Sequence, residues 1–149
     1  MTESEKPVRI KSILVPVDGS TYSERALKYA CLMAGPLQAE VIVLHVVPML
    51  VSAATTHDTS APHPYLTLQK VGEDIIARAK LLADRLGCRI TEMMLHGEPA
   101  SQIIAVAQEK NVDLIIMGSR GMGTIKRILV GSNSDRVIRQ ASCPVMVVR

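Results

Sequence analysis

Five short aliphatic runs alternate with segments of helical periodicity, and this alternation constrains the fold of the chain more than any other feature. The runs are the expected strands, at 12–17, 40–47, 89–95, 114–117 and 145–148. Between them, apolar residues recur at helical spacing in the expected helices, at 21–34, 65–86, 99–111 and 133–140. Strands separated by helices predict an α/β fold.

The second run, EVIVLHVV, is aliphatic at nearly every position. Continuous runs of this kind are typical of a parallel sheet that helices cover on both faces. We therefore expect a three-layer sandwich with a five-stranded, mainly parallel sheet and right-handed crossovers. Ligands bind such sheets at the carboxyl ends of the strands, beside the point where the strand order reverses. Asp18 follows the first run and Gly118 the fourth, so a site is expected there if these two strands flank that point.

Length and composition limit the possible functions. A chain of 149 residues is expected to form one domain, 1–149, with a long polar surface loop at 49–64. The net charge of +3 is spread without a long run of one sign, and Trp and Phe are absent, which argues against nucleic acid as the partner. No apolar run is long enough for a membrane span and no signal-peptide core is present, so we expect a cytoplasmic protein. Three cysteines without a CxxC pair predict reduced thiols.

The stretch GSRGMGTIKRILVGSNS, residues 118–134, carries the strongest functional pattern. Glycines let backbone amides approach a ligand without an intervening Cβ, and successive exposed amides form an anion-binding concavity. The stretch contains Gly118, Gly121, Gly123 and Gly131, with the cations Arg120, Lys126 and Arg127. Ser132 is placed to cap the next helix, whose free amides would face the same concavity. These features predict a phosphate site; the alternative is a set of turns with a solvated cationic face.

Two common phosphate motifs are absent from the sequence. It contains no GxxxxGK[ST], so the mechanism of P-loop NTPases is unsupported. A dinucleotide-binding GxGxxG should follow the first strand, but that position reads VDGSTYS, and the glycines follow the fourth strand instead. A nicotinamide-dependent dehydrogenase is therefore not expected.

The glycine spacing resembles that of a known family. Gly118, Gly121, Gly131 and Ser132 match GxxG(x9)G[ST], the signature of the ATP-binding branch of the universal stress protein family. The segments LVPVDGS, VIVLHVV, VDLIIMGSRG and CPVMVVR are also similar to that family, so the resemblance covers nearly the whole chain. It implies an adenine nucleotide alpha hydrolase-like, Rossmann-like fold that binds ATP with Mg²⁺.

The resemblance also implies a role for individual residues. In ATP-binding members, the counterparts of Pro16, Val17 and Asp18 contact the adenosine end, and the Asp lies near the ribose and the metal. The counterpart of Val46 reads adenine through its backbone, and Met117 corresponds to an apolar residue beside the base. Ribose and phosphates are held by the counterparts of Gly118, Gly121, Gly131, Ser132, Ser134 and, through its main-chain amide, Asn133.

Family members form homodimers through their last strands, which here contain Val145, Val147 and Val148. An unpaired aliphatic edge favours such pairing. Three functions stay open: an ATP-binding stress-response module that acts as a nucleotide-dependent switch on an unknown downstream protein, a slow ATPase or phosphotransferase that uses Asp18 and Mg²⁺, and a structural dimer without nucleotide. No residue near the glycines has the pattern of an activated nucleophile, which favours the binding module.

Overall fold

In the computed structural model, five parallel strands form one sheet in the order β3-β2-β1-β4-β5. The structure describes residues 2–49, 64–121 and 131–149; most of the predicted 49–64 loop lies outside them, as do Gly123, Lys126 and Arg127. The strands are β1 (Ser12–Pro16), β2 (Glu40–Pro48), β3 (Ile90–Gly97), β4 (Leu114–Gly118) and β5 (Val145–Val148). Because β1 pairs with both β2 and β4, the order reverses between β1 and β4, which meets the condition set for a site beside Asp18 and Gly118.

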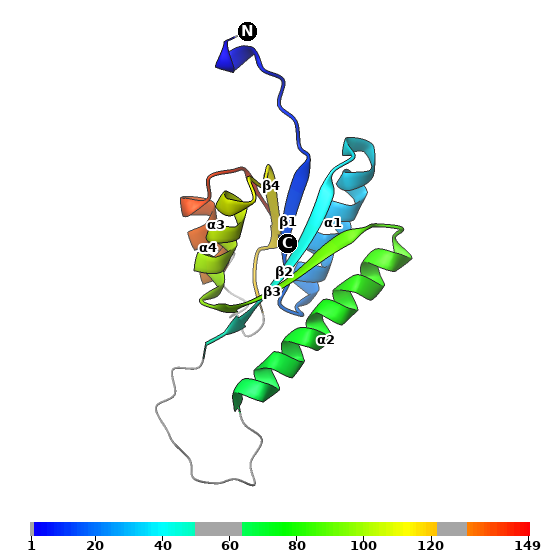
Figure 1. The fold of residues 1–149 in the computed structure, drawn as a ribbon, viewed down its shortest axis with the longest axis vertical. Coiled ribbons are helices and arrows are strands. Elements are labelled where there is room, and N and C mark those ends of the chain that lie inside the picture. The colour runs from blue at the N-terminus through cyan, green and yellow to red at the C-terminus, as the bar shows by residue number, and fades with distance from the viewer. Residues whose placement is uncertain (1, 50–63, 122–130) are drawn as a thin grey trace.

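Helices cover both faces of this sheet (Figure 1). On one face lie α1 (Thr21–Leu37) and α2 (Pro64–Arg85), and on the other lie α3 (Pro99–Glu109) and α4 (Ser132–Gln140). Alternate strand residues enter two separate aliphatic cores, with Val43 packing on the α1 side and Leu44 on the α3 side. The two cores confirm the predicted three-layer sandwich and explain why the runs show no polar alternation. None of the described helices is long and apolar enough to cross a membrane.

The helix ends follow local backbone chemistry. The Ser20 side chain caps α1 by accepting a hydrogen bond from the Ser23 amide at 3.2 Å. Helix α1 continues past its predicted end at residue 34 to Leu37, with Pro36 in its last turn. Gln38 then closes the helix in a left-handed conformation. A short 3-10 turn at Glu3–Glu5 precedes β1.

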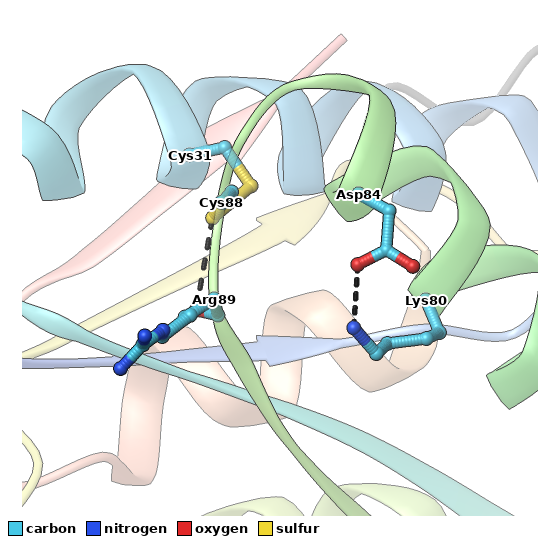
Figure 2. Close-up of a disulfide and its surroundings, with 5 residues drawn as sticks. All are labelled: Cys31, Lys80, Asp84, Cys88 and Arg89. Atoms are coloured by element: carbon cyan, nitrogen blue, oxygen red, sulfur yellow. Dashed lines mark hydrogen bonds and ion pairs between the residues drawn. A yellow bond between two sulfur atoms is a disulfide. The ribbon is translucent and has the colours of Figure 1, made fainter.

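The prediction of reduced thiols is wrong for two of the three cysteines. Cys31, in α1, and Cys88, just before β3, form a disulfide whose Cα atoms lie 5.5 Å apart (Figure 2). The pairing spans 57 positions, and such a long-range contact leaves no local signal in the sequence. Cys143 is a free cysteine; burial is the main cause that raises the pKa of its thiol, and the neighbouring Asp113 raises it further.

Candidate functional site

A cavity of about 780 Å³ lies at the carboxyl edge of the sheet, where β1, β2 and β4 end. Every predicted site residue within the described part of the chain lines it: Pro16, Val17, Asp18, Val46, Met117, Gly118, Arg120, Gly121, Gly131, Ser132, Asn133 and Ser134. Gly123 falls outside the described residues. The fold therefore joins three segments that the sequence could only propose as neighbours.

The loop after β1 holds Asp18 in a fixed orientation. Its Oδ1 accepts a hydrogen bond from the Ser20 amide at 2.9 Å, and the Asp18 amide donates to the Ser23 hydroxyl at 3.4 Å. Asp18 thus shapes the turn that precedes α1. It is also the only carboxylate among the described residues that line the cavity.

Two glycines of the motif stand where a side chain would collide. A Cβ on Gly118 would lie 2.6 Å from Cβ of Tyr22 and 2.9 Å from its carbonyl carbon, so glycine lets β4 approach the first turn of α1. A Cβ on Gly121 would collide with Oδ2 of Asp18. Gly118 therefore serves packing, whereas Gly121 lets the glycine-containing segment approach the carboxylate.

Hydrogen bonds attach the described ends of the glycine-containing segment to the ends of β4 and β5. The Gly131 amide donates to the Ser119 carbonyl at 2.6 Å, and the Ser119 amide donates to the Val148 carbonyl at 2.7 Å. The Ser134 hydroxyl donates to the Gly118 carbonyl at 2.7 Å. Gly121 and Gly131, the described residues nearest to the middle of this segment, therefore both lie at the cavity.

The start of α4 differs from the prediction that Ser132 caps it. Gly131 occupies the cap position and Ser132 is the first helical residue, and no side chain in the described part of the chain caps this end. The extended backbone of Gly131 takes the cap conformation, which moves Ser132 into the helix. The first amides of α4 are left to bind an acceptor in the cavity.

Arg120 places a positive charge at the same wall. Its guanidinium lies 5.7 Å from the centre of the Tyr22 ring, a cation–π distance that orients the side chain. Its Nε is buried and has no hydrogen-bond partner among the residues that the structure describes. Buried donors in folded proteins are normally paired, so this one fits an anionic ligand group.

Sequence reasoning missed the opposite wall of the cavity. Helix α2 contributes four residues to it: Leu68, Val71, Ile75 and Arg78. His45 completes this wall; it is 7% exposed, and its Nδ1 lies 2.7 Å from the Val17 carbonyl, which ties it to the end of β1. The amphipathic period of α2 identified its apolar side, but periodicity gives no information on which part of that side meets a cavity.

An ion pair joins the two helices on the other face of the sheet. Glu98 caps α3 by accepting from the amides of Ala100 and Ser101, and it pairs with Arg136 of α4 at 2.5 Å. The hydrogen bond from Ser101 is the main cause that lowers the pKa of the Glu98 carboxyl. The pair joins the N-cap of α3 to the second turn of α4, near Pro99 and Ser132 of the cavity.

A second hollow, of about 670 Å³, lies between α2 and β3, but it contains no predicted site residue. Its lining is Glu73, Ile76, Ala77, Lys80, Leu81, Glu92, Met93 and Met94. Among the described residues, no cluster of three or more His, Cys, Asp or Glu side chains is arranged to hold a metal ion. The first cavity, which contains the described residues of the glycine motif, is therefore the candidate site for a ligand with phosphate groups.

Solved structures of similar fold include complexes with nucleotides. One is a universal stress protein in complex with cAMP, with 24% identity, a TM-score of 0.71, and coverage of 93% of this chain and 97% of the other. Another is the universal stress protein from Archaeoglobus fulgidus in complex with dAMP, with 23% identity, a TM-score of 0.68, and coverage of 96% and 100%. At these identities the likeness shows a shared fold.

Closer relatives define the family. Universal stress protein MJ0531 of Methanocaldococcus jannaschii is 37% identical over 93% of this chain and 82% of its own length. The structure of protein MJ0577, also a universal stress protein of that organism, matches with 31% identity and a TM-score of 0.74 over 95% of this chain and 96% of that one. The sequence model of the Universal stress protein family matches residues 9–149. The chain belongs to the universal stress protein family.

Proposed function

We propose that the chain binds ATP with Mg²⁺ at the carboxyl edge of its sheet and acts in the cytoplasm as a nucleotide-dependent switch in the stress response. The observation that carries this proposal is the convergence of all described motif residues on one cavity. Its volume, about 780 Å³, lies within the range typical of ligand pockets. Two proteins of the same fold hold cAMP and dAMP.

The described residues fit a nucleotide by their chemistry. Arg120 offers a buried, unpaired Nε, and the uncapped first turn of α4 offers backbone amides; both suit phosphate oxygens. Val46 and Met117 are 7% and 5% exposed and provide apolar surface for a base. Asp18 can share a Mg²⁺ ion with the phosphates, because Mg²⁺ is commonly bound by one or two carboxylates plus substrate phosphates.

Binding is favoured over rapid hydrolysis. Asp18 is the only lining carboxylate among the described residues, and in this proposal Mg²⁺ occupies it. A general base must reach the attacking water with an oxygen free to accept its proton. The site therefore retains nucleotide, with at most slow turnover.

The experiment is to denature the purified protein and identify released small molecules by mass spectrometry. The proposal predicts an adenine nucleotide in wild-type protein and its loss from Gly121→Ala, whose Cβ would collide with Oδ2 of Asp18. Gly35→Ala is the matched control, because a Cβ at Gly35 meets nothing within 4 Å and the variant should keep its nucleotide. Equal nucleotide content in both variants would reject the role given to Gly121.

We also propose that β5 pairs with β5 of a second copy to form a homodimer. Strand β5 is an edge of the sheet, and the carbonyls of Pro144 and Val148 accept hydrogen bonds from the β4 side. In a parallel ladder the backbone groups of Val145 and Val147 then point to the free edge. The side chain of Val148 is 5% exposed and belongs to the core, so the edge offered to a partner is mainly backbone.

Val147→Pro tests the dimer, since it removes an outward amide without breaking the bonds to β4. The proposal predicts monomers by light scattering for this variant, and dimers for wild-type protein and for the control Val147→Ala. A dimeric Val147→Pro would place the interface elsewhere.

A further inference from the structure

The Cys31–Cys88 disulfide joins the two helices that flank one side of the cavity (Figure 2). Cys31 lies in α1, whose N-terminal end follows Asp18 and contributes Ser23 to the lining. Cys88 lies directly after α2, whose first half contributes Leu68, Val71 and Ile75. The bond is therefore a covalent link between two helices that both contribute to the lining of the cavity.

Cys88 is rigidly attached to α2. Its amide donates to the Ala83 carbonyl at 2.9 Å, and the Gly87 amide donates to the Asp84 carbonyl at 3.1 Å, with Gly87 at a φ of 64°. These bonds form the Schellman closure of a helix end. Ala83 itself is fully buried. A restraint at Cys88 is thus transmitted to α2, a rod of 22 residues and about 33 Å.

A polar link between the side chains of α1 and α2 is weak. Arg78 and Glu24 form an ion pair at 2.9 Å, but their side chains are 61% and 42% exposed. Exposed pairs of this kind contribute little, because water and salt screen them. The position of α2 against α1 therefore depends on apolar packing and on the disulfide.

Reagents in solution can reach the pair. Cys31 and Cys88 are both half-buried, and the neighbours Leu86, Gly87 and Arg89 are exposed. A thiolate at Cys88 can attack a small disulfide RSSR to form a mixed disulfide and release one RSH. The Cys31 thiolate then displaces the second RSH and closes the bond, so two protein thiols are oxidised while RSSR is reduced to two RSH.

We propose that Cys31 and Cys88 form a reversible thiol–disulfide exchange site that sets the nucleotide affinity of the cavity. The substrate class is a low-molecular-weight disulfide in one direction and its thiol in the other. Oxidation holds the α2 wall in the position seen here, so the cavity is pre-organised and binds more tightly. Reduction frees α2 relative to α1 and weakens binding. The effect on affinity rests on the proposed function, whereas the exchange itself does not.

The test equilibrates the protein in glutathione buffers of graded ratio and measures the intact mass, thiol content and ATP affinity. We expect one intramolecular disulfide to form and the affinity of the oxidised form to be about fivefold higher. Cys31→Ser with Cys88→Ser should show the reduced-form affinity in every buffer, and Cys143→Ser should respond as wild type does. Equal ATP affinity of the oxidised and reduced forms would overturn the coupling, and failure of the pair to form would overturn the site.

A second measurement separates this proposal from the proposed function. If neither form binds ATP, the proposed function fails, and hydrogen exchange of the α2 amides still tests the restraint. Slower exchange of residues 64–85 in the oxidised form would uphold the tether. Identical exchange in both forms would reject it.

Discussion

The two walls of the cavity are built in different ways. The glycine wall, defined as residues 118–121 and 131–134, consists of strand and helix ends that present amides, hydroxyls and Arg120. The α2 wall, defined as Leu68, Val71, Ile75 and Arg78 with His45, is mainly aliphatic. The first wall needs particular residues at particular positions, whereas the second needs a helix held at the right place. Recognition and positioning are thus assigned to opposite sides of one site.

The largest expected effect concerns how the α2 wall is held. Replacing both cysteines, Cys31→Ser with Cys88→Ser, removes a cross-link that spans 57 positions, which should lower the free energy of unfolding by about 4 kcal/mol. Urea denaturation under non-reducing conditions measures this loss. Cys143→Ser should change the unfolding free energy far less, and an unchanged midpoint for the double variant would show that the tether does not stabilise the fold.

The second prediction tests whether the glycine wall recognises the nucleotide. Gly121→Ala should weaken ATP binding by about tenfold or more, or about 1.4 kcal/mol, because its Cβ displaces the Asp18 carboxylate. Calorimetric titration measures the affinity, with Gly35→Ala as the control. A loss of stability in place of affinity would make Gly121 a packing glycine like Gly118.

A matched change on the α2 wall should give the reverse result. Ile75 is 9% exposed, and Ile75→Val should lower the free energy of unfolding by about 1 kcal/mol. We expect its ATP affinity to fall less than that of Gly121→Ala, because a smaller aliphatic side chain keeps the wall apolar. If Ile75→Val weakened binding as much as Gly121→Ala, the contrast between the walls would be wrong.

The smallest expected effect concerns the pH dependence of stability that comes from the Glu98–Arg136 ion pair, next to the glycine wall. In the folded protein the Ser101 hydrogen bond, with a smaller contribution from Arg136, lowers the pKa of the Glu98 carboxyl below its usual value of 4.5, so the ionised carboxylate stabilises the fold above that pH. This contribution is lost as the pH falls below 4.5 and through the folded pKa, and for an exposed pair it is less than about 1 kcal/mol. Unfolding curves of wild type and Glu98→Gln between pH 3 and 7 should converge at the acid end, where both side chains are neutral; a constant gap would contradict this reading.

The sequence predicted the residues of the glycine wall better than those of the α2 wall. Glycines and strand runs act through local backbone chemistry, so the strands and the residues of the glycine wall could be predicted, whereas the place of the strand order reversal entered only as a condition. The Cys31–Cys88 pairing and the contribution of Ile75 depend on how distant helices pack, and neither leaves a local pattern. The cap of α4 was misplaced by one residue, because Gly131 adopts the cap conformation that Ser132 was expected to take.

The most direct measurement is a calorimetric titration of nucleotide-free protein with ATP and Mg²⁺. The account predicts one site per chain with an affinity in the micromolar range or tighter, abolished or strongly weakened in Gly121→Ala and retained in Gly35→Ala. The account would be contradicted if wild-type protein gave no binding heat at any ATP concentration. A nucleotide-soaked crystal would then show no nucleotide density beside Asp18 and Arg120. The cavity would then be a consequence of the fold and not a nucleotide site.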